Sequence, residues 1–544
     1  MDKSLENHRR ELIRQAIELW EERGEFHDIE QDPVVQLLFS ALAYQSHTIL
    51  QEIASFQEMT VNEFRNKLIP YYLIKPFPAY SIVHTKISEN TKGRIEPLIT
   101  FLVDEKCTFE FGKAKIPFTP LFNINILNAT IDGQQVNNQD HTIEFTLTSK
   151  NVIEDFAGAA FYFEGIDDHF DLEITMDNQV LPLIKPDDYD NLPFSDWFQN
   201  HLITTGENQL QLGSYDYWQE LYLKHHFQLF IINDYNTAQL SNRSLTPVFK
   251  FQFKNMLHWE QLRDCTIKIN CIPVVNVQKN TVNLTDDEPV KKLSTDNTAF
   301  LNLLFDKNTE NNIDDFIIRH FGIERYSQKE LLFQLNDLFN RYVSDYYAFK
   351  EIDELKKGDK LEAIYRTFKE LLPVIKKSNI DLHPSVYAIL KLGDKLIRPV
   401  DKVEINYTTT HGVFANGIKR GEKTVAVTNF LDKNNTFLLL DTVGGRNEER
   451  NEDNLNHLAR YHCLTKDKLI TASDLKVFCY RELQQKIRKV SVDNTGEKIV
   501  LTIRLKDEFI PREASDLTDF AKLIQHKIKV RSLFSIPVHV VITG

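Results

Sequence analysis

Hydrophobic residues follow a helical spacing at the start of the chain. Within residues 1–70 they recur every seven positions, which places them on one face of an amphipathic helix. Asp32 can cap this helix, and Pro33 suits its first turn, where no partner for a backbone N–H is needed. We therefore predict a helical region over residues 1–70. The apolar face, called the seam below, consists of Val35, Leu42, Ile49 and Phe56.

Between residues 71 and 293 the spacing changes to two. Phe249, Phe251 and Phe253 alternate with polar residues, as in a strand with one buried face. Several such runs separated by polar loops predict a large β-rich domain, either a sandwich or a barrel-like sheet. The other runs are Ala79–Ile87, Thr142–Thr148, Asp171–Met176, His226–Ile232 and Thr266–Val275.

Helical spacing returns over residues 294–400, and residues 401–544 mix both patterns. We predict an α+β, multidomain protein with N-terminal helices, a large β-rich domain, a helical middle region and a C-terminal mixed domain. The predicted domains are 1–70, 71–293, 294–400 and 401–544. In the last domain the predicted helices are Asn454–Tyr461, Ala472–Gln485 and Asp516–Lys529, and the predicted strands are Thr424–Thr428, Thr436–Asp441, Lys498–Lys506 and Val538–Thr543.

Composition narrows the classes of function. The net charge of −14 argues against nucleic acid as the main ligand, because such binding depends on Lys and Arg neutralising phosphates. The apolar runs are too short to span a bilayer, and the first residues lack the apolar core of a secretory signal. We therefore expect a cytoplasmic protein without membrane insertion. Its 37 Phe and 19 Tyr favour strands and buried interfaces.

Three groups of residues suggest catalytic or metal chemistry. His225 and His226 are adjacent, so on a strand they point to opposite faces and cannot easily share a metal. Cys265 and Cys271 would lie about 20 Å apart on one continuous strand, too far for a disulfide. The third group matches no compact zinc module in its spacing. It consists of His457, His462, Cys463 and Cys479.

The familiar nucleotide, hydrolase and metalloprotease motifs are absent from the sequence. The paired Gly444-Gly445 fits a tight turn before a helix better than a phosphate cradle, because acidic residues follow it. We therefore predict no catalytic residues, no cofactor and no metal site.

Two segments resemble the TssF family of type VI secretion systems. The first runs from Asp32 through the passage LIPYYLIKPFPAYSIV, which ends at Val83 and is similar to the family's "LYPHYLRP-x-PS-x-x-I-V". Ile69 and Tyr71 depart from that pattern. The second, NCIPVVNV at Asn270–Val277, is similar to the family's "NCTPVVNLF". Two motifs in the right order are more specific than either alone.

The last quarter of the chain resembles phage baseplate J proteins. It contains Gly444-Gly445, an acidic stretch, the sequence LITASDL from Leu469 and the sequence IRKV from Ile487. The helix and final strand within Leu517–Thr543 are also similar to the end of J proteins. TssF and J proteins are thought to share an origin, so the two resemblances agree.

The resemblance implies a structural subunit of a contractile injection machine, and no enzyme. Such a subunit builds the baseplate wedge around the hub and couples docking to sheath contraction, in the cytoplasm near the inner membrane of a bacterium. The implied partners are TssG-like, TssE-like and TssK-like subunits, with two copies of the chain per TssG-like chain. The seam is then a candidate partner-binding surface, although packing within its own domain is the simpler reading of an amphipathic helix.

Three alternatives stay open at the level of sequence. One is a baseplate protein of a phage-tail-derived extracellular injection system, which the neighbouring genes would distinguish. A second is a β-rich ligand-binding or adhesion module, suggested by the aromatic content. A third is a cytoplasmic hydrolase whose acidic catalytic residues are scattered along the chain.

Overall fold

The computed structural model describes most of residues 71–184, 229–304 and 403–543, together with residues 316–321 and 385–390. Elsewhere it describes short helical stretches, among them residues 37–46 and 336–344. Close contacts divide the chain into two units. One unit comprises Met1–Pro70 and Gly322–Pro384, and the other comprises Tyr71–Phe321 and Ser385–Gly544. The four predicted domains stay a prediction beside this division.

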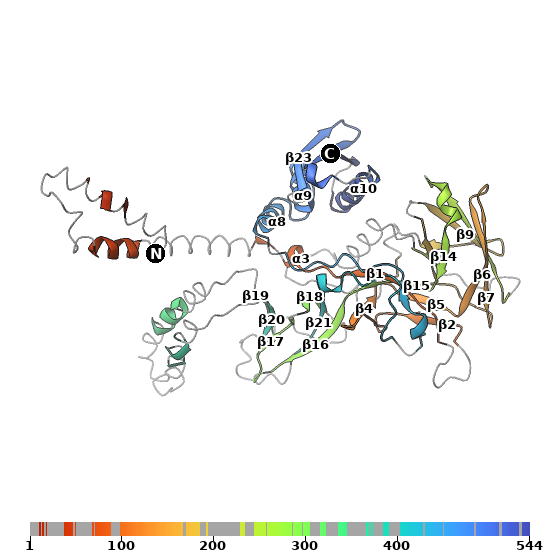
Figure 1. The fold of residues 1–544 in the computed structure, drawn as a ribbon, viewed down its shortest axis with the longest axis horizontal. Helices are drawn as coiled ribbons and strands as arrows, with labels where there is room; N and C mark the ends of the chain where they lie inside the picture. Colours follow the sequence, from red (N-terminus) through yellow and green to blue (C-terminus); the bar gives the residue numbers. More distant parts are fainter. Residues whose placement is uncertain are drawn as a thin grey trace. The chain divides into compact units, whose positions relative to one another are not determined.

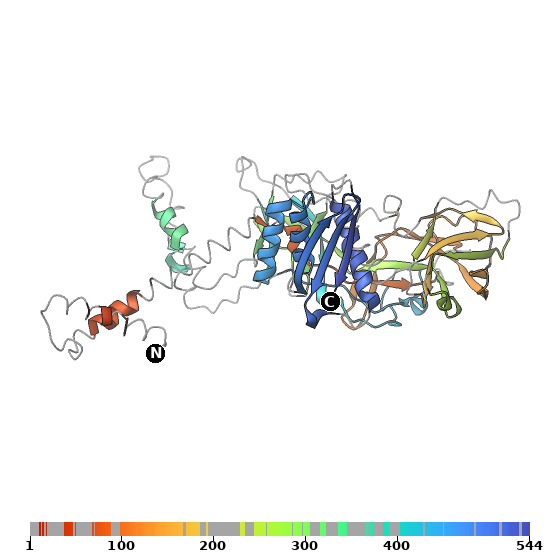
Figure 2. The ribbon, with the colours of Figure 1, turned by 90° about the horizontal axis from the view of Figure 1, so that it is seen from above.

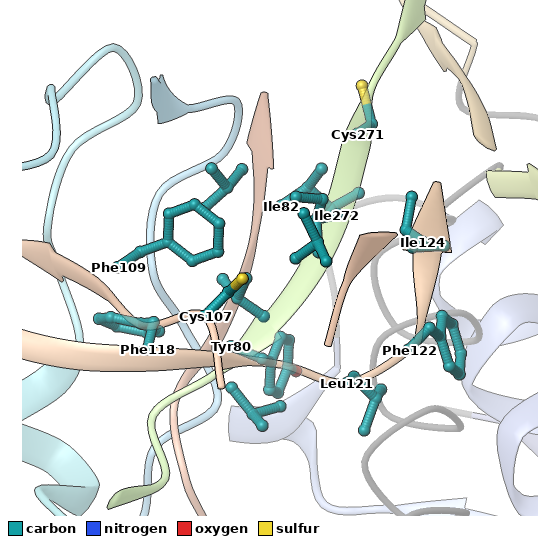
Figure 3. Packing of buried hydrophobic residues seen from close by; sticks show 14 of the residues in the cluster. Tyr80, Ile82, Cys107, Phe109, Phe118, Leu121, Phe122, Ile124, Cys271 and Ile272 are labelled. Carbon is teal, nitrogen blue, oxygen red and sulfur yellow. The ribbon is translucent and has the colours of Figure 1, made fainter. Parts of the chain in front are cut away.

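The described chain is mostly β-rich with few helices, so the predicted α+β class fits it only loosely (Figure 1). A five-stranded sheet has the order β22-β1-β15-β4-β3, and its strands pair antiparallel. Its buried side chains form a core that includes Tyr80, Ile82 and Phe118 (Figure 3). The strands are β1 (Tyr80–His84), β3 (Phe109–Phe111), β4 (Ile116–Pro120), β15 (Cys271–Val275) and β22 (Phe437–Leu438), and the short helix α3 (Tyr71–Ile74) precedes β1. A two-stranded sheet joins β2 (Thr100–Val103) and β5 (Ile124–Leu127).

Two further sheets face each other across a core rich in phenylalanine. Phe249 and Phe251 on one sheet contact Phe161 on the other, with ring centroids 5.7 and 5.2 Å apart. The predicted alternation is confirmed, because Phe249, Phe251 and Phe253 are buried while Lys250 and Lys254 pair with glutamates outside. The first sheet contains β6 (Ala129–Asn137), β7 (Thr142–Ser149), β9 (Asp171–Met176), β10 (Gln179–Leu181) and β13 (Val248–Lys254). The second contains β8 (Ala160–Glu164), β11 (Leu183–Ile184), β12 (Leu229–Ile232) and β14 (Thr266–Ile269).

The middle region differs from the predicted run of helices. Between residues 294 and 400 the structure has three strands, and the described helical residues lie between the second and third of them. These strands are continuous apolar runs, which periodicity cannot distinguish from buried helix. The two small sheets here contain β16 (Gln278–Leu284), β18 (Ala299–Leu304) and β21 (Val403–Thr410), and β17 (Val290–Lys292), β19 (Phe316–Phe321) and β20 (Ser385–Leu390).

The C-terminal region confirms its predicted helices and most of its strands. A three-stranded sheet of order β23-β24-β25, seen in Figure 2, packs its apolar side chains against helices. Strands β24 and β25 run parallel, joined through α10. The elements are α8 (Glu452–Thr465), α9 (Ala472–Leu483), β23 (Ile487–Asn494), β24 (Ile499–Leu505), α10 (Ala514–Arg531) and β25 (Val538–Thr543). Four short 3₁₀ turns are Trp259–Arg263, Gly412–Ala415, Lys433–Asn435 and Asp507–Phe509.

Buried charges join the helices of this region. Asp467, in the turn after α8, pairs with Arg481 of α9 at 3.1 Å and with Arg531 of α10 at 3.3 Å. Glu482 of α9 pairs with Lys527 of α10 at 3.0 Å. Burial alone would raise the pKa of Glu482, but Lys527 and the neighbouring arginines lower it to about 2. Glu482 is therefore ionised at neutral pH and holds α9 against α10.

In the part of the chain that the structure describes, no helix is long and apolar enough to cross a membrane.

Candidate functional site

The three segments that resemble known families meet at strand β1. On one side β1 pairs with β15, with Tyr80 opposite Val275. On the other side it bonds to the loop that follows β22: Tyr80 N donates to Val443 O at 2.9 Å. Phe77 and Arg446 exchange two backbone hydrogen bonds of 2.9 Å. Segments far apart in the sequence thus form one hydrogen-bonded layer, called the junction below.

The paired glycines are required by the close packing of this junction. Gly444 adopts a left-handed conformation with φ of +85°, and a Cβ there would overlap the buried ring of Tyr80. A Cβ on Gly445 would collide with the carbonyl oxygen of Gly412. Asn416 clamps Gly445 in place, because its amide nitrogen donates to Gly445 O and its amide oxygen accepts from Gly445 N, both at 2.8 Å. The predicted turn is therefore also a contact between distant segments.

Two buried asparagines bracket the apolar strand β15. Asn270, at φ of +59°, exchanges two 2.8 Å hydrogen bonds with the backbone of Leu127. Asn276 is fully buried, donates to Pro117 O at 2.6 Å and accepts from His411 N at 2.7 Å. Each side chain replaces a backbone partner where strand pairing ends, which satisfies groups that would be costly to bury alone.

Sequence analysis did not assign these asparagine roles. A signal was present: amide residues stand at both ends of an uninterrupted apolar run, and a buried amide must find hydrogen-bond partners. The same position explains why the prediction of one continuous strand over Thr266–Val275 is wrong. The left-handed Asn270 breaks that run into β14 and β15, which belong to different sheets.

The cysteines near this break are structural. Cys265 lies in the phenylalanine-rich core and Cys271 in the core of the first sheet, so they do not share one face as a continuous strand would require. Burial raises the pKa of Cys265 to about 12 and raises that of Cys271 further. Both thiols stay protonated and unreactive at neutral pH.

The candidate histidine and cysteine groups do not form a metal site where the structure describes them. His457 stacks on Tyr480 with ring centroids 6.3 Å apart, and Cys479 is buried with its pKa raised to about 12. Cys463 is exposed. Across the described ranges, no three potential ligands among His, Cys, Asp and Glu come together. The pair His225-His226 lies outside the described residues.

A hollow of about 620 Å³ lies where β4 and β16 diverge, beside the junction. His411 is part of its wall, and burial lowers the pKa of the imidazole, so the ring is neutral at pH 7. The charged lining residues are Lys106, Lys115, Lys279, Glu105 and Glu110. This arrangement can bind a polar group by charge and hydrogen bonds.

The predicted seam is described at two of its four positions. Leu42 is 50% exposed and Ile49 is 54% exposed, although both were expected on the apolar side of a helix. Val35 and Phe56 lie outside the described residues. Between them, residues 37–46 are helical, and Leu37 and Leu38 are also exposed. None of the four hydrophobic clusters of the described residues includes any part of this stretch.

Comparisons with known proteins give two similar solved structures. A chain of the TssK-TssF-TssG baseplate subcomplex of a type VI secretion system shares 10% identity, with a TM-score of 0.44 over 91% of this chain and 95% of that chain. A chain of the anti-feeding prophage baseplate shares 8% identity, with a TM-score of 0.32 over 94% and 68%. Both TM-scores are too low to assign a shared fold. No model of a protein family matches the sequence, and no curated protein matches it.

Proposed function

We propose that this chain is a structural subunit of the baseplate of a contractile injection machine, of the TssF kind, and that it catalyses no reaction. The supporting observation is the junction. Segments that resemble the family by sequence, around Tyr80, Asn276 and Gly444, bond directly to one another. Residues that build a shared structural core are expected to lie together in this way, and their contacts explain why Gly and Asn stand at these positions.

In its finer form the proposal makes the chain a wedge protein around the hub that couples docking to sheath contraction. Its proposed partners are TssG-like, TssE-like and TssK-like subunits, with two copies of this chain for each TssG-like chain. The proposed place is the bacterial cytoplasm near the inner membrane.

The proposed partner-binding surface is the seam of Val35, Leu42, Ile49 and Phe56. Its support is the exposure of Leu42 and Ile49, each about half accessible in the single chain. Leucine and isoleucine at heptad spacing gain free energy when a second helix covers them. A partner helix that packs along the seam would supply that burial.

The test is co-expression of this chain with its genomic neighbours, followed by affinity purification and native mass spectrometry. We expect a discrete complex that holds two copies of this chain and one copy of a second subunit. A stable monomer that binds none of its neighbours would contradict the proposal. A complex of a different stoichiometry would keep the structural role but reject the two-to-one wedge.

A further inference from the structure

The turn after β21 displays two large apolar side chains to solvent. Val413 is 49% exposed and Phe414 is 64% exposed, whereas Gly412 and Ala415 on either side of them are buried. A single exposed apolar residue is ordinary on a protein surface. Here two stand side by side, and the backbone that carries them is fixed from below.

Polar side chains hold the backbone of this turn at several points. Gly412 has φ of +51°, and a Cβ there would press on Asn447 Oδ1 and Arg446 O at 2.7 and 3.0 Å, so the position requires glycine. A turn fixed in this way keeps its shape without a partner. The bonds are Asn276 Oδ1 with His411 N (2.7 Å), Asn447 Oδ1 with Val413 N (3.3 Å), and Thr442 Oγ1 with Ala415 O (2.7 Å).

Cations surround the two apolar side chains. His411, directly before the turn, lines the hollow that also contains Lys106, Lys115 and Lys279. On the side of the glycine pair, Arg446 is exposed, with its guanidinium carbon 4.6 Å from the ring centroid of Phe77. Four cationic side chains thus stand near the turn, against the two glutamates that line the hollow.

We propose that Val413 and Phe414 anchor a protein–protein interface, and that the partner is a protein subunit with an apolar pocket whose rim carries carboxylates. A large aromatic side chain in a partner's pocket is the typical centre of binding energy in an interface. The fixed backbone lowers the ordering cost of binding. The surrounding cations select a partner with an acidic rim. This interface is separate from the seam and does not depend on it.

The test is photo-cross-linking of the full chain in cells that express it together with its neighbouring genes. p-Benzoylphenylalanine replaces Phe414, and Val180 (63% exposed on β10) is the control position. We expect an adduct with one other protein at position 414, through a peptide that contains Asp or Glu, and none at position 180. Combining Lys115→Glu with Lys279→Glu should lower the adduct yield about tenfold, because like charges then oppose each other across the interface.

Several results would overturn this inference. They are no adduct above the control level, an adduct with a second copy of this chain, or an adduct whose yield the two charge reversals leave unchanged. The same probe at Ile49 reports on the seam and therefore on the proposed function. A loss of cross-linking at one position and its persistence at the other would show which of the two proposals fails.

Discussion

The ring of Tyr80 occupies the space in which a side chain on Gly444 would have to lie. Tyr80 is fully buried in the core of the first sheet, 364 residues before Gly444 in the sequence, so the ring cannot move aside without opening that core. This contact ties the end of the chain's helical N-terminal segment to the loop that leads into α8.

The first prediction follows from this contact. Gly444→Ala should lower the free energy of unfolding by about 3 kcal/mol or more, because it adds a core clash to an unfavourable backbone conformation. Gly417→Ala is the matched control: its φ of +81° is similar, but nothing lies within 4 Å of the added Cβ. That control should cost only about 1 kcal/mol. Denaturant unfolding measures both, and equal losses would show that packing on Tyr80 is unimportant.

The second prediction concerns Asn276. Asn276→Ala removes the partners of Pro117 O and His411 N in a buried place, and should cost about 3 kcal/mol. Asn138→Ala, on an exposed position after β6, should cost less than about 0.5 kcal/mol. The two variants are compared by chemical denaturation. If Asn276→Ala is as stable as the control, the amide does not hold the strands together.

The third prediction concerns pH and Glu482. Its pKa is lowered from 4.5 to about 2 by its cationic neighbours, so the folded state favours the ionised form. The resulting stability, about 3 kcal/mol, is fully present above pH 4.5 and is lost as pH falls towards 2. Hydrogen exchange of the α9 amides in the wild-type chain and in Glu482→Gln measures this. The difference between the two should shrink as pH falls below 4.5, and a difference independent of pH would contradict the assignment.

The fourth prediction concerns the seam. Leu42→Asp combined with Ile49→Asp should abolish binding to the partner subunit and leave the chain folded, because both side chains are already about half exposed. Val180→Asp, at an exposed apolar position of β10, should keep binding. Native mass spectrometry reports the complex and circular dichroism reports the fold. Unfolding of the double variant would instead make the seam part of the chain's own core.

The fifth prediction concerns thiol reactivity. Of the five cysteines, Cys463 is exposed and the other four are buried. Iodoacetamide at pH 8 should therefore modify Cys463 alone in the folded protein, since burial keeps the thiols of Cys265, Cys271 and Cys479 protonated. Peptide mass spectrometry identifies the site. Fast modification of a buried thiol would show that its core opens in solution.

Strong local patterns in the sequence were sufficient for many elements. The alternation at Phe249–Phe253 predicted a strand with one buried face, and the helical spacing near Leu475 and Ile524 predicted α9 and α10. These predictions held because a period of two or of 3.6 places apolar residues on one face whatever the rest of the chain does. Apolar runs without a clear period failed, as at Ala299–Leu304, where strand and buried helix look alike.

The sequence by itself determined the strands and helices with one apolar face, the lack of familiar catalytic motifs, and the segments that resemble baseplate proteins. Only the tertiary structure decided that β1 lies between β15 and the loop of Gly444, that Asn270 sends Cys265 and Cys271 into different cores, and that Phe414 stands exposed on a fixed turn. The physical reason is that local periodicity fixes which face of an element is buried. Which distant segment covers that face depends on shape, on backbone hydrogen bonds and on the few positions where only Gly or Asn fits.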